Sequence, residues 1–169
     1  MLITRARIRS ISVFRACNLA TRRDHVIFQH AWSFDRSLSF IGIDRTWAVF
    51  KESEIARYQD NGSASITVVD ALTGRQRFAY ISGENPSYPA PKAGSLAVTD
   101  RGVLGWVSEN SVYALVDDYK IVTLDQGGTI AGLHADGHSL LWTHDGAPRR
   151  FPRGGTALHR GFPQLAVRA

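Results

Sequence analysis

Short apolar runs alternate with polar turn residues along most of this chain of 169 residues. The run "SITVV" at 65–69, for example, is followed by the turn "DALTG" at 70–74 and then by another apolar run. Short runs bounded by Gly, Asp and Asn are typical of β-strands joined by tight turns. The pattern therefore predicts strands at 11–16, 25–29, 38–43, 46–51, 65–69, 76–81, 95–99, 103–107, 111–116, 120–124, 129–134 and 139–143.

Helical periodicity is almost absent, and its best candidate is "FKESEIARYQD" at 50–60. Phe50, Ile55 and Tyr58 are apolar with polar residues between them, which predicts one or two helical turns or a long polar hairpin loop. Many short strands with frequent turns predict an all-β fold, which could be a propeller, a sandwich or a barrel.

The predicted turns carry Asp and Gly where the chain has to reverse. Gly74 can adopt the positive φ that the reversal at 70–74 requires, and Asp70 begins that turn. The segments "TDRG" at 99–102 and "ADG" at 135–137 have the same chemistry. We expect the Asp side chains to accept hydrogen bonds from backbone amides just ahead of them.

One element recurs along the chain: an Asp at the turn and an aromatic residue six positions later. A second element recurs as well, since "CNLATRR" at 17–23 aligns with "VDALTGR" at 69–75. Two interleaved elements predict a repeated unit of about four strands. The first element is formed by three residue pairs: Asp44 with Phe50, Asp100 with Trp106, and Asp136 with Trp142.

The strands after the three Asp turns, "WAVF", "VLGWV" and "SLLW", are apolar on both faces. A strand in a sheet with one face in water would alternate apolar and polar residues, whereas a strand in a propeller blade packs against neighbouring blades through both faces. Gly105, within the second of these runs, suits the close approach of a packed neighbour.

These motifs resemble β-propellers of the bacterial TolB-like and WD-type repeats. "HADGHSLLWTHDGAPRRF" at 134–151 is similar to their Asp-Gly hairpin, apolar strand and second Gly turn, and "ITVVDALTGRQRFAY" at 66–80 is similar to their outer strand pair. The resemblance implies antiparallel four-stranded sheets, about three blades, and hence a partial or half propeller. The resemblance covers a repeat domain at 11–151, which leaves a basic flank at 1–10 and a basic Gly/Pro-rich tail at 152–169.

Composition and charge narrow the classes of partner. The net charge is +5, but all 15 carboxylates lie in residues 24–145, so the basic character belongs to the two ends. This predicts solvated flanks and no sequence-specific nucleic-acid face. Cys17 is the only cysteine, which excludes an intramolecular disulfide and any multi-Cys zinc site. With no long apolar run and no signal peptide, we expect no membrane span and a cytoplasmic protein, or an extracytoplasmic one if its N-terminus is truncated.

Candidate chemistry is sparse. His134, Asp136 and His138, with His144 nearby, form the only dense set of metal-type ligands, and they predict a site for zinc or another divalent cation. No other cofactor is expected, and no catalytic residue is assigned. Trp32 lies outside the apolar repeat strands and is the candidate for contact with a partner.

We therefore expect a non-catalytic binding or scaffold domain with a protein partner, or one that self-associates as a homodimer completing a ring. The alternative from another class is a hydrolase acting on sugars or peptides, with catalytic groups on the loops at 82–93 and 51–63. Glu52 and Glu54, two positions apart, would share a face of a strand as an acid/base pair does, although solvated charge on a loop explains them equally. A third alternative is a fragment of a larger propeller protein with no independent function.

Overall fold

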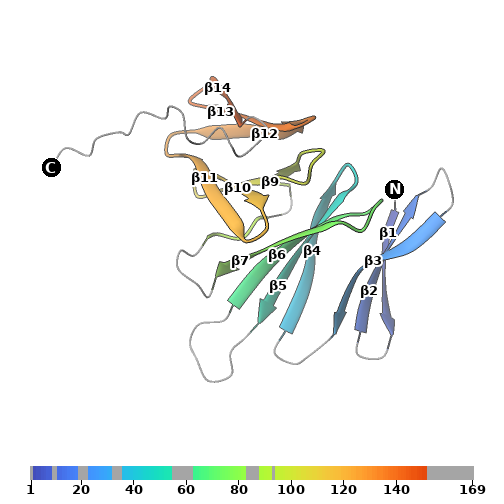
Figure 1. The fold of residues 1–169 in the computed structure, drawn as a ribbon. Coiled ribbons are helices and arrows are strands. Elements are labelled where there is room, and N and C mark those ends of the chain that lie inside the picture. The colour runs from blue at the N-terminus through green and yellow to red at the C-terminus, as the bar shows by residue number, and fades with distance from the viewer. Residues whose placement is uncertain are drawn as a thin grey trace.

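A computed structural model describes residues 2–8, 11–18, 23–31, 36–54, 63–82, 88–92 and 94–151. Within these residues the chain forms fourteen strands and no helix, which confirms the predicted all-β class. No described helix, accordingly, is long and apolar enough to cross a membrane. The strands form four antiparallel sheets that lie side by side in chain order (Figure 1).

Each sheet is a meander of consecutive strands. The first and fourth sheets have three strands, and the second and third sheets have four. The first sheet is β1 (Leu2–Ile8), β2 (Ile11–Asn18) and β3 (Arg23–Ala31), and the second is β4 (Arg36–Asp44), β5 (Trp47–Glu54), β6 (Ser63–Asp70) and β7 (Gln76–Ser82). The third sheet is β8 (Leu96–Val98), β9 (Leu104–Ser108), β10 (Ser111–Asp117) and β11 (Lys120–Gln126), and the fourth is β12 (Ile130–Asp136), β13 (Ser139–His144) and β14 (Ala147–Phe151).

Every strand predicted from the apolar pattern coincides with an observed strand, and two observed strands were missed. Strand β1 lies within residues 1–10, where we expected a flank, and pairs with β2 along its full length. Strand β14 pairs with β13. Arg residues interrupt the apolar pattern in "LITRARI" and "APRRF", so neither segment shows a run of the predicted kind.

Of the two alternatives for residues 50–60, helical turns or a long hairpin loop, the helical turns are absent from the described part of this segment. Strand β5 continues to Glu54, with Glu52 opposite Leu38 on one side and Ser65 on the other. Pairing with two neighbouring strands therefore overrides the weak helical periodicity. Residues 55–60 lie outside the described part of the chain.

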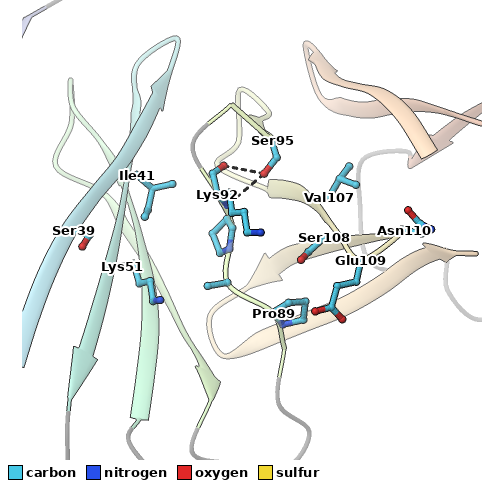
Figure 2. A pocket seen from close by; sticks show the side chains of 12 residues that line it. Ser39, Ile41, Lys51, Pro89, Lys92, Ser95, Val107, Ser108, Glu109 and Asn110 are labelled. Carbon is cyan, nitrogen blue, oxygen red and sulfur yellow. Dashed lines mark hydrogen bonds between the residues drawn. The ribbon is translucent and has the colours of Figure 1, made fainter. Parts of the chain in front are cut away.

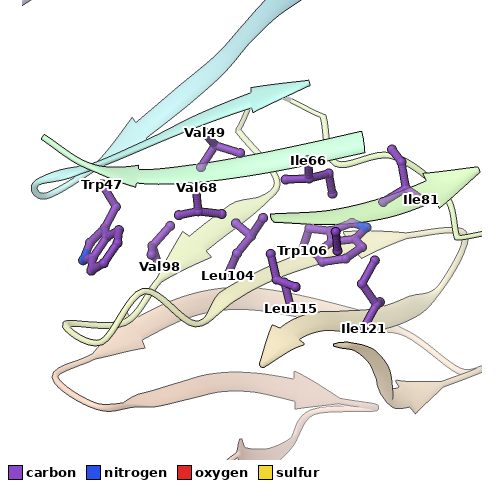
Figure 3. Packing of buried hydrophobic residues seen from close by; sticks show 11 residues of the cluster. Trp47, Val49, Ile66, Val68, Ile81, Val98, Leu104, Trp106, Leu115 and Ile121 are labelled. Atoms are coloured by element: carbon purple, nitrogen blue, oxygen red, sulfur yellow. The ribbon is translucent and has the colours of Figure 1, made fainter. Parts of the chain in front are cut away.

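Successive sheets pack face to face, and one apolar cluster fills each of the three interfaces. The largest cluster joins the second and third sheets and buries Trp47, Val68, Leu104 and Trp106 (Figure 3). A second cluster joins the first and second sheets, and a third joins the third and fourth sheets. Instead of the expected three blades, the chain thus builds a row of four sheets.

The strands after the Asp turns are buried on both faces, as predicted. Along β5, Trp47 and Val49 face the third sheet, whereas Ala48 and Phe50 face the first sheet. The repeated aromatic residues Phe50, Trp106 and Trp142 are each buried and each face the preceding sheet. The aromatic repeat thus fills the same position of each interface.

Candidate functional site

An open cleft of about 730 Å³ lies between the second and third sheets (Figure 2). Its walls come from β4 and β5 on one side and from the β9–β10 turn on the other, with residues 88–92 between them. Its lining combines apolar side chains with hydroxyl, amide and charged groups. The lining residues are Ser39, Ile41, Lys51, Pro89, Ala90, Pro91, Lys92, Ser95, Val107, Ser108, Glu109 and Asn110.

The segment 88–92 is fixed against the core of the second and third sheets. The amide of Tyr88 donates to the carbonyl of Ile81 (2.6 Å), and its hydroxyl donates to the carbonyl of Ile121 (3.3 Å). The indole of Trp106 donates to the carbonyl of Pro89 (2.8 Å), and Pro91 is buried. These bonds fix the segment that lies between the two walls of the cleft.

A tight hairpin turn forms the opposite wall. Glu109 and Asn110, between β9 and β10, have φ angles of 50° and 56°. Two successive positive φ angles are typical of the two-residue turns that match the twist of a hairpin. Asn tolerates this conformation well, whereas Glu is uncommon there. The turn places the exposed carboxylate of Glu109 at the cleft.

The two ammonium groups that line the cleft have no anionic partner among the described residues. Lys51 is half-buried on β5 and Lys92 is exposed. Within the described residues neither lysine forms an ion pair, whereas Arg15, Arg36, Arg45 and Arg77 each pair with a carboxylate. Ser95 is already engaged, because its hydroxyl donates to the carbonyl of Lys92 (2.8 Å). The described lining includes neither His nor Cys, so it has hydroxyls and ammonium groups but no imidazole or thiol.

The three repeated Asp turns meet in space and join consecutive sheets. The carboxylate of Asp44 accepts a hydrogen bond from the amide of Val98 (2.6 Å), and the amide of Asp100 donates to the carbonyl of Gly137 (2.8 Å). Arg45 forms an ion pair with Asp100 and donates to the carbonyl of Ala135 (2.6 Å). Asp44 and Asp100 are thus engaged in contacts between sheets.

The turn at 70–74 has the predicted chemistry. The carboxylate of Asp70 accepts hydrogen bonds from the amide of Leu72 (3.0 Å) and the hydroxyl of Thr73 (2.7 Å), and Gly74 has a φ of 73°. The prediction is wrong for Asp100, whose own turn is closed by the hydroxyl of Thr99 accepting from the amide of Val103 (3.1 Å). The carboxylate of Asp100 instead forms an ion pair with the guanidinium of Arg45.

The structure does not assemble the predicted metal site. Among the described residues, no three His, Cys, Asp or Glu side chains lie close enough together to hold a metal ion. His134 bonds through Nδ1 with the carbonyl of Gly132 (2.7 Å), and Nδ1 of His138 lies 3.9 Å from the carboxylate of Asp100. Asp136 lies opposite Ser139 at the end of the β12–β13 hairpin. The two histidines therefore have different neighbours on either side of the turn.

Glu52 and Glu54 share a face of β5, as expected for a strand, and Arg36 holds both of them. Its guanidinium lies 3.7 Å from Glu52 and 3.3 Å from Glu54. Trp32 lies outside the described residues, as do residues 83–87 and 93 of the loop at 82–93.

A partly buried polar network between the third and fourth sheets was not predicted. Asp125 on β11 accepts hydrogen bonds from the indole of Trp142 (2.7 Å) and pairs with Nδ1 of His144 (2.8 Å). Burial raises the pKa of Asp125, but the hydrogen bonds from Trp142 and His144 and the charge of His144 outweigh burial and bring this pKa below its ordinary value. The partners belong to different sheets, so no local motif marks them.

A scan against protein-family models and searches of curated proteins and of solved structures found no match to this chain.

Proposed function

We propose that this chain is a partial β-propeller that acts as a non-catalytic binding domain. Its support is architectural: four antiparallel meanders follow one another in the chain, and each packs face to face on the next. Blades of a propeller are sheets of this kind, packed in this way.

The ligand of this domain binds in the cleft between the second and third sheets. The observation that carries this proposal is a preformed opening of about 730 Å³ whose two lysines have no ion pair among the described residues. Ligand sites are typically pockets of about 300–1,000 Å³ with an apolar lining and a few polar groups. Ile41, Pro89 and Val107 supply the apolar part of this lining.

Blocking the cleft tests this proposal. Ser39→Trp places a large ring on β4 at the cleft, and Ser37→Trp is its control because Ser37 is exposed on the same strand outside the lining. A small-molecule library is screened by ligand-observed NMR against the parent and both variants. We expect ligands of the parent and of Ser37→Trp to lose binding to Ser39→Trp. An absence of ligands for the parent, or equal binding to Ser39→Trp, would refute the cleft as a binding site.

The outer face of the first sheet favours self-association as a second function. Leu2 is 50% exposed, and Ile11 and Val26 are each 38% exposed. Because Phe14 and Ala16 on β2 and Ile3 on β1 face the second sheet, alternation places these three residues on the opposite face. Exposed apolar side chains gathered on one sheet face are typical of an association surface.

A second copy of this chain is the partner that this face suits. The outer face of the fourth sheet carries exposed His134, Asp136 and Arg150, which do not complement an apolar surface. Two first sheets, by contrast, complement each other about a two-fold axis. The homodimer proposed here thus pairs first sheets and does not close a ring.

Light scattering measures this association directly. The parent should have twice the mass of the monomer, and Val26→Glu should be monomeric, with Gln76→Glu on β7, outside the first sheet, as the exposed control. A monomeric parent, or a dimer that survives Val26→Glu, would rule out this interface.

A further inference from the structure

Two of the three lysines of this chain line one cleft. The chain has 17 arginines but only Lys51, Lys92 and Lys120. Lys51 comes from β5 and Lys92 from the segment beside it, and both line the opening between the second and third sheets (Figure 2). In a chain that otherwise uses arginine, a compact ammonium group at both positions marks the cleft as chemically distinct.

Lys51 forms no ion pair among the described residues, although the residue is half-buried. Its ammonium nitrogen is not among the buried polar atoms that lack a hydrogen-bond partner, so this group still reaches water at the cleft. The guanidinium of Arg77, by contrast, already contacts Asp117 (3.1 Å) and the carbonyl of Arg101 (3.2 Å). The ammonium group of Lys51 is therefore available to an anionic ligand that enters the cleft.

Glu109 opposes the two lysines and limits the charge of the ligand. Its carboxylate lies on the β9–β10 turn and also lines the cleft. Two ammonium groups and one carboxylate leave a net charge of +1 in the described lining. The apolar side chains of Ile41, Pro89 and Val107 add a surface for an uncharged part of the ligand.

We infer that the cleft binds a small organic anion, with its carboxylate or phosphate group at Lys51 and Lys92 and its apolar part against Pro89 and Val107. This inference rests on the proposed function, because it names the ligand class of the same cleft.

Three probes of one shape and different charge test the inference. Benzoate is an anion, benzamide is its neutral counterpart and benzamidine is its cationic counterpart. Each is titrated at millimolar concentration into the parent protein, and binding is followed by the chemical shifts of backbone amides lining the cleft. We expect benzoate to bind about tenfold more tightly than benzamide and benzamidine to bind least.

Lysine variants locate the charge that the probe contacts. Lys51→Gln should weaken benzoate binding about tenfold, and the more exposed Lys92→Gln about threefold. Lys120→Gln is the matched control, because this lysine is exposed on β11 outside the lining, and it should leave binding unchanged. Glu109→Gln should tighten benzoate binding about twofold and leave benzamide binding as it was.

The outcomes separate the two proposals. If benzamide or benzamidine binds as tightly as benzoate, or if Lys120→Gln weakens benzoate as much as Lys51→Gln does, the cleft binds ligands but the anionic class is wrong. If none of the three probes shifts an amide lining the cleft, this inference fails. The library screen against Ser39→Trp then decides separately whether the cleft binds anything else.

Discussion

Gly105 lies directly against Leu140, across the interface of the third and fourth sheets: a Cβ atom on Gly105 would be 2.7 Å from Cδ1 of Leu140. Leu140 is fully buried, so its side chain has little room to move aside. We expect Gly105→Ala to lower the free energy of unfolding by about 1–3 kcal/mol through overpacking, measured by urea denaturation.

Gly42→Ala is the control for this effect. Gly42 also lies in a strand, but a Cβ atom there would be 3.7 Å from Leu96, an ordinary van der Waals contact. The free energy of unfolding of the Gly42→Ala variant should differ from that of the parent by less than about 0.5 kcal/mol. If both variants lose the same free energy of unfolding, the loss comes from replacing a glycine within a strand and not from the contact between the sheets.

Gly102 combines a positive φ of 77° with close contact to the ring of Trp47, 2.6 Å from a Cβ atom. Gly74 has a similar φ of 73° but no atom within 4 Å of its Cβ position. Gly74→Ala should therefore lower the free energy of unfolding by about 1–2 kcal/mol, through the strain of a positive φ in the backbone alone. Gly102→Ala should cost about 1–3 kcal/mol more, because the ring of Trp47 must move. Equal costs in urea denaturation would contradict the packing role of Gly102.

Asp125 makes stability depend on pH in the acidic range. Its pKa in the folded protein lies below the value of about 3.9 expected for an unfolded chain. The stabilisation is therefore fully present above about pH 3.9 and is lost as the pH falls through the lower pKa of the folded state. Asp125→Asn should lower the free energy of unfolding by about 1–3 kcal/mol near neutral pH and flatten its dependence on pH in the acidic window.

Asp24→Asn is the comparison for Asp125→Asn, because Asp24 also pairs with a cation but is exposed. Its partner is Arg15, at 2.7 Å, and its side chain is 52% exposed, against 15% for Asp125. We expect a loss of at most about 1 kcal/mol from this surface pair. If both variants change stability and its pH dependence alike, the network around Asp125 has no special role.

Arg45 and Asp100 should be energetically coupled, since they join the turns of the second and third sheets. A double-mutant cycle of Arg45→Met and Asp100→Asn should give a coupling energy of about 0.5–1 kcal/mol, because both side chains are partly exposed. Arg45→Met should cost more than Asp100→Asn, since it also loses the bond to the carbonyl of Ala135. A coupling energy near zero would mean that the contact between the two side chains does not stabilise the fold.

The strands were predictable from sequence because burial on both faces produces apolar runs such as "WAVF", and because turns require particular residues such as Asp70 and Gly74. Strands β1 and β14 were not, since they belong to the two end sheets and exposed arginines interrupt their apolar residues: Arg5 in β1, and Arg149 and Arg150 in β14. Their pairing depends on the neighbouring strand and not on their own composition.

The cleft could not be predicted in the same way. Lys51, Lys92 and Glu109 are far apart in the sequence and meet only because the second sheet packs against the third. The predicted metal ligands show the reverse case: His134 and His138 are close in sequence, yet the hairpin gives them different neighbours. Nearness in the chain is a poor guide wherever a turn separates two side chains.

The order of the sheets in space repeats their order in the chain, so each apolar cluster joins stretches that follow one another closely. Such a row can assemble one neighbour at a time, without first closing a long loop. The two central sheets have partners on both sides, whereas the end sheets have one each. Amide hydrogens of β1–β3 and β12–β14 should therefore exchange with deuterium first, and the row should unravel from its ends before the central pair opens.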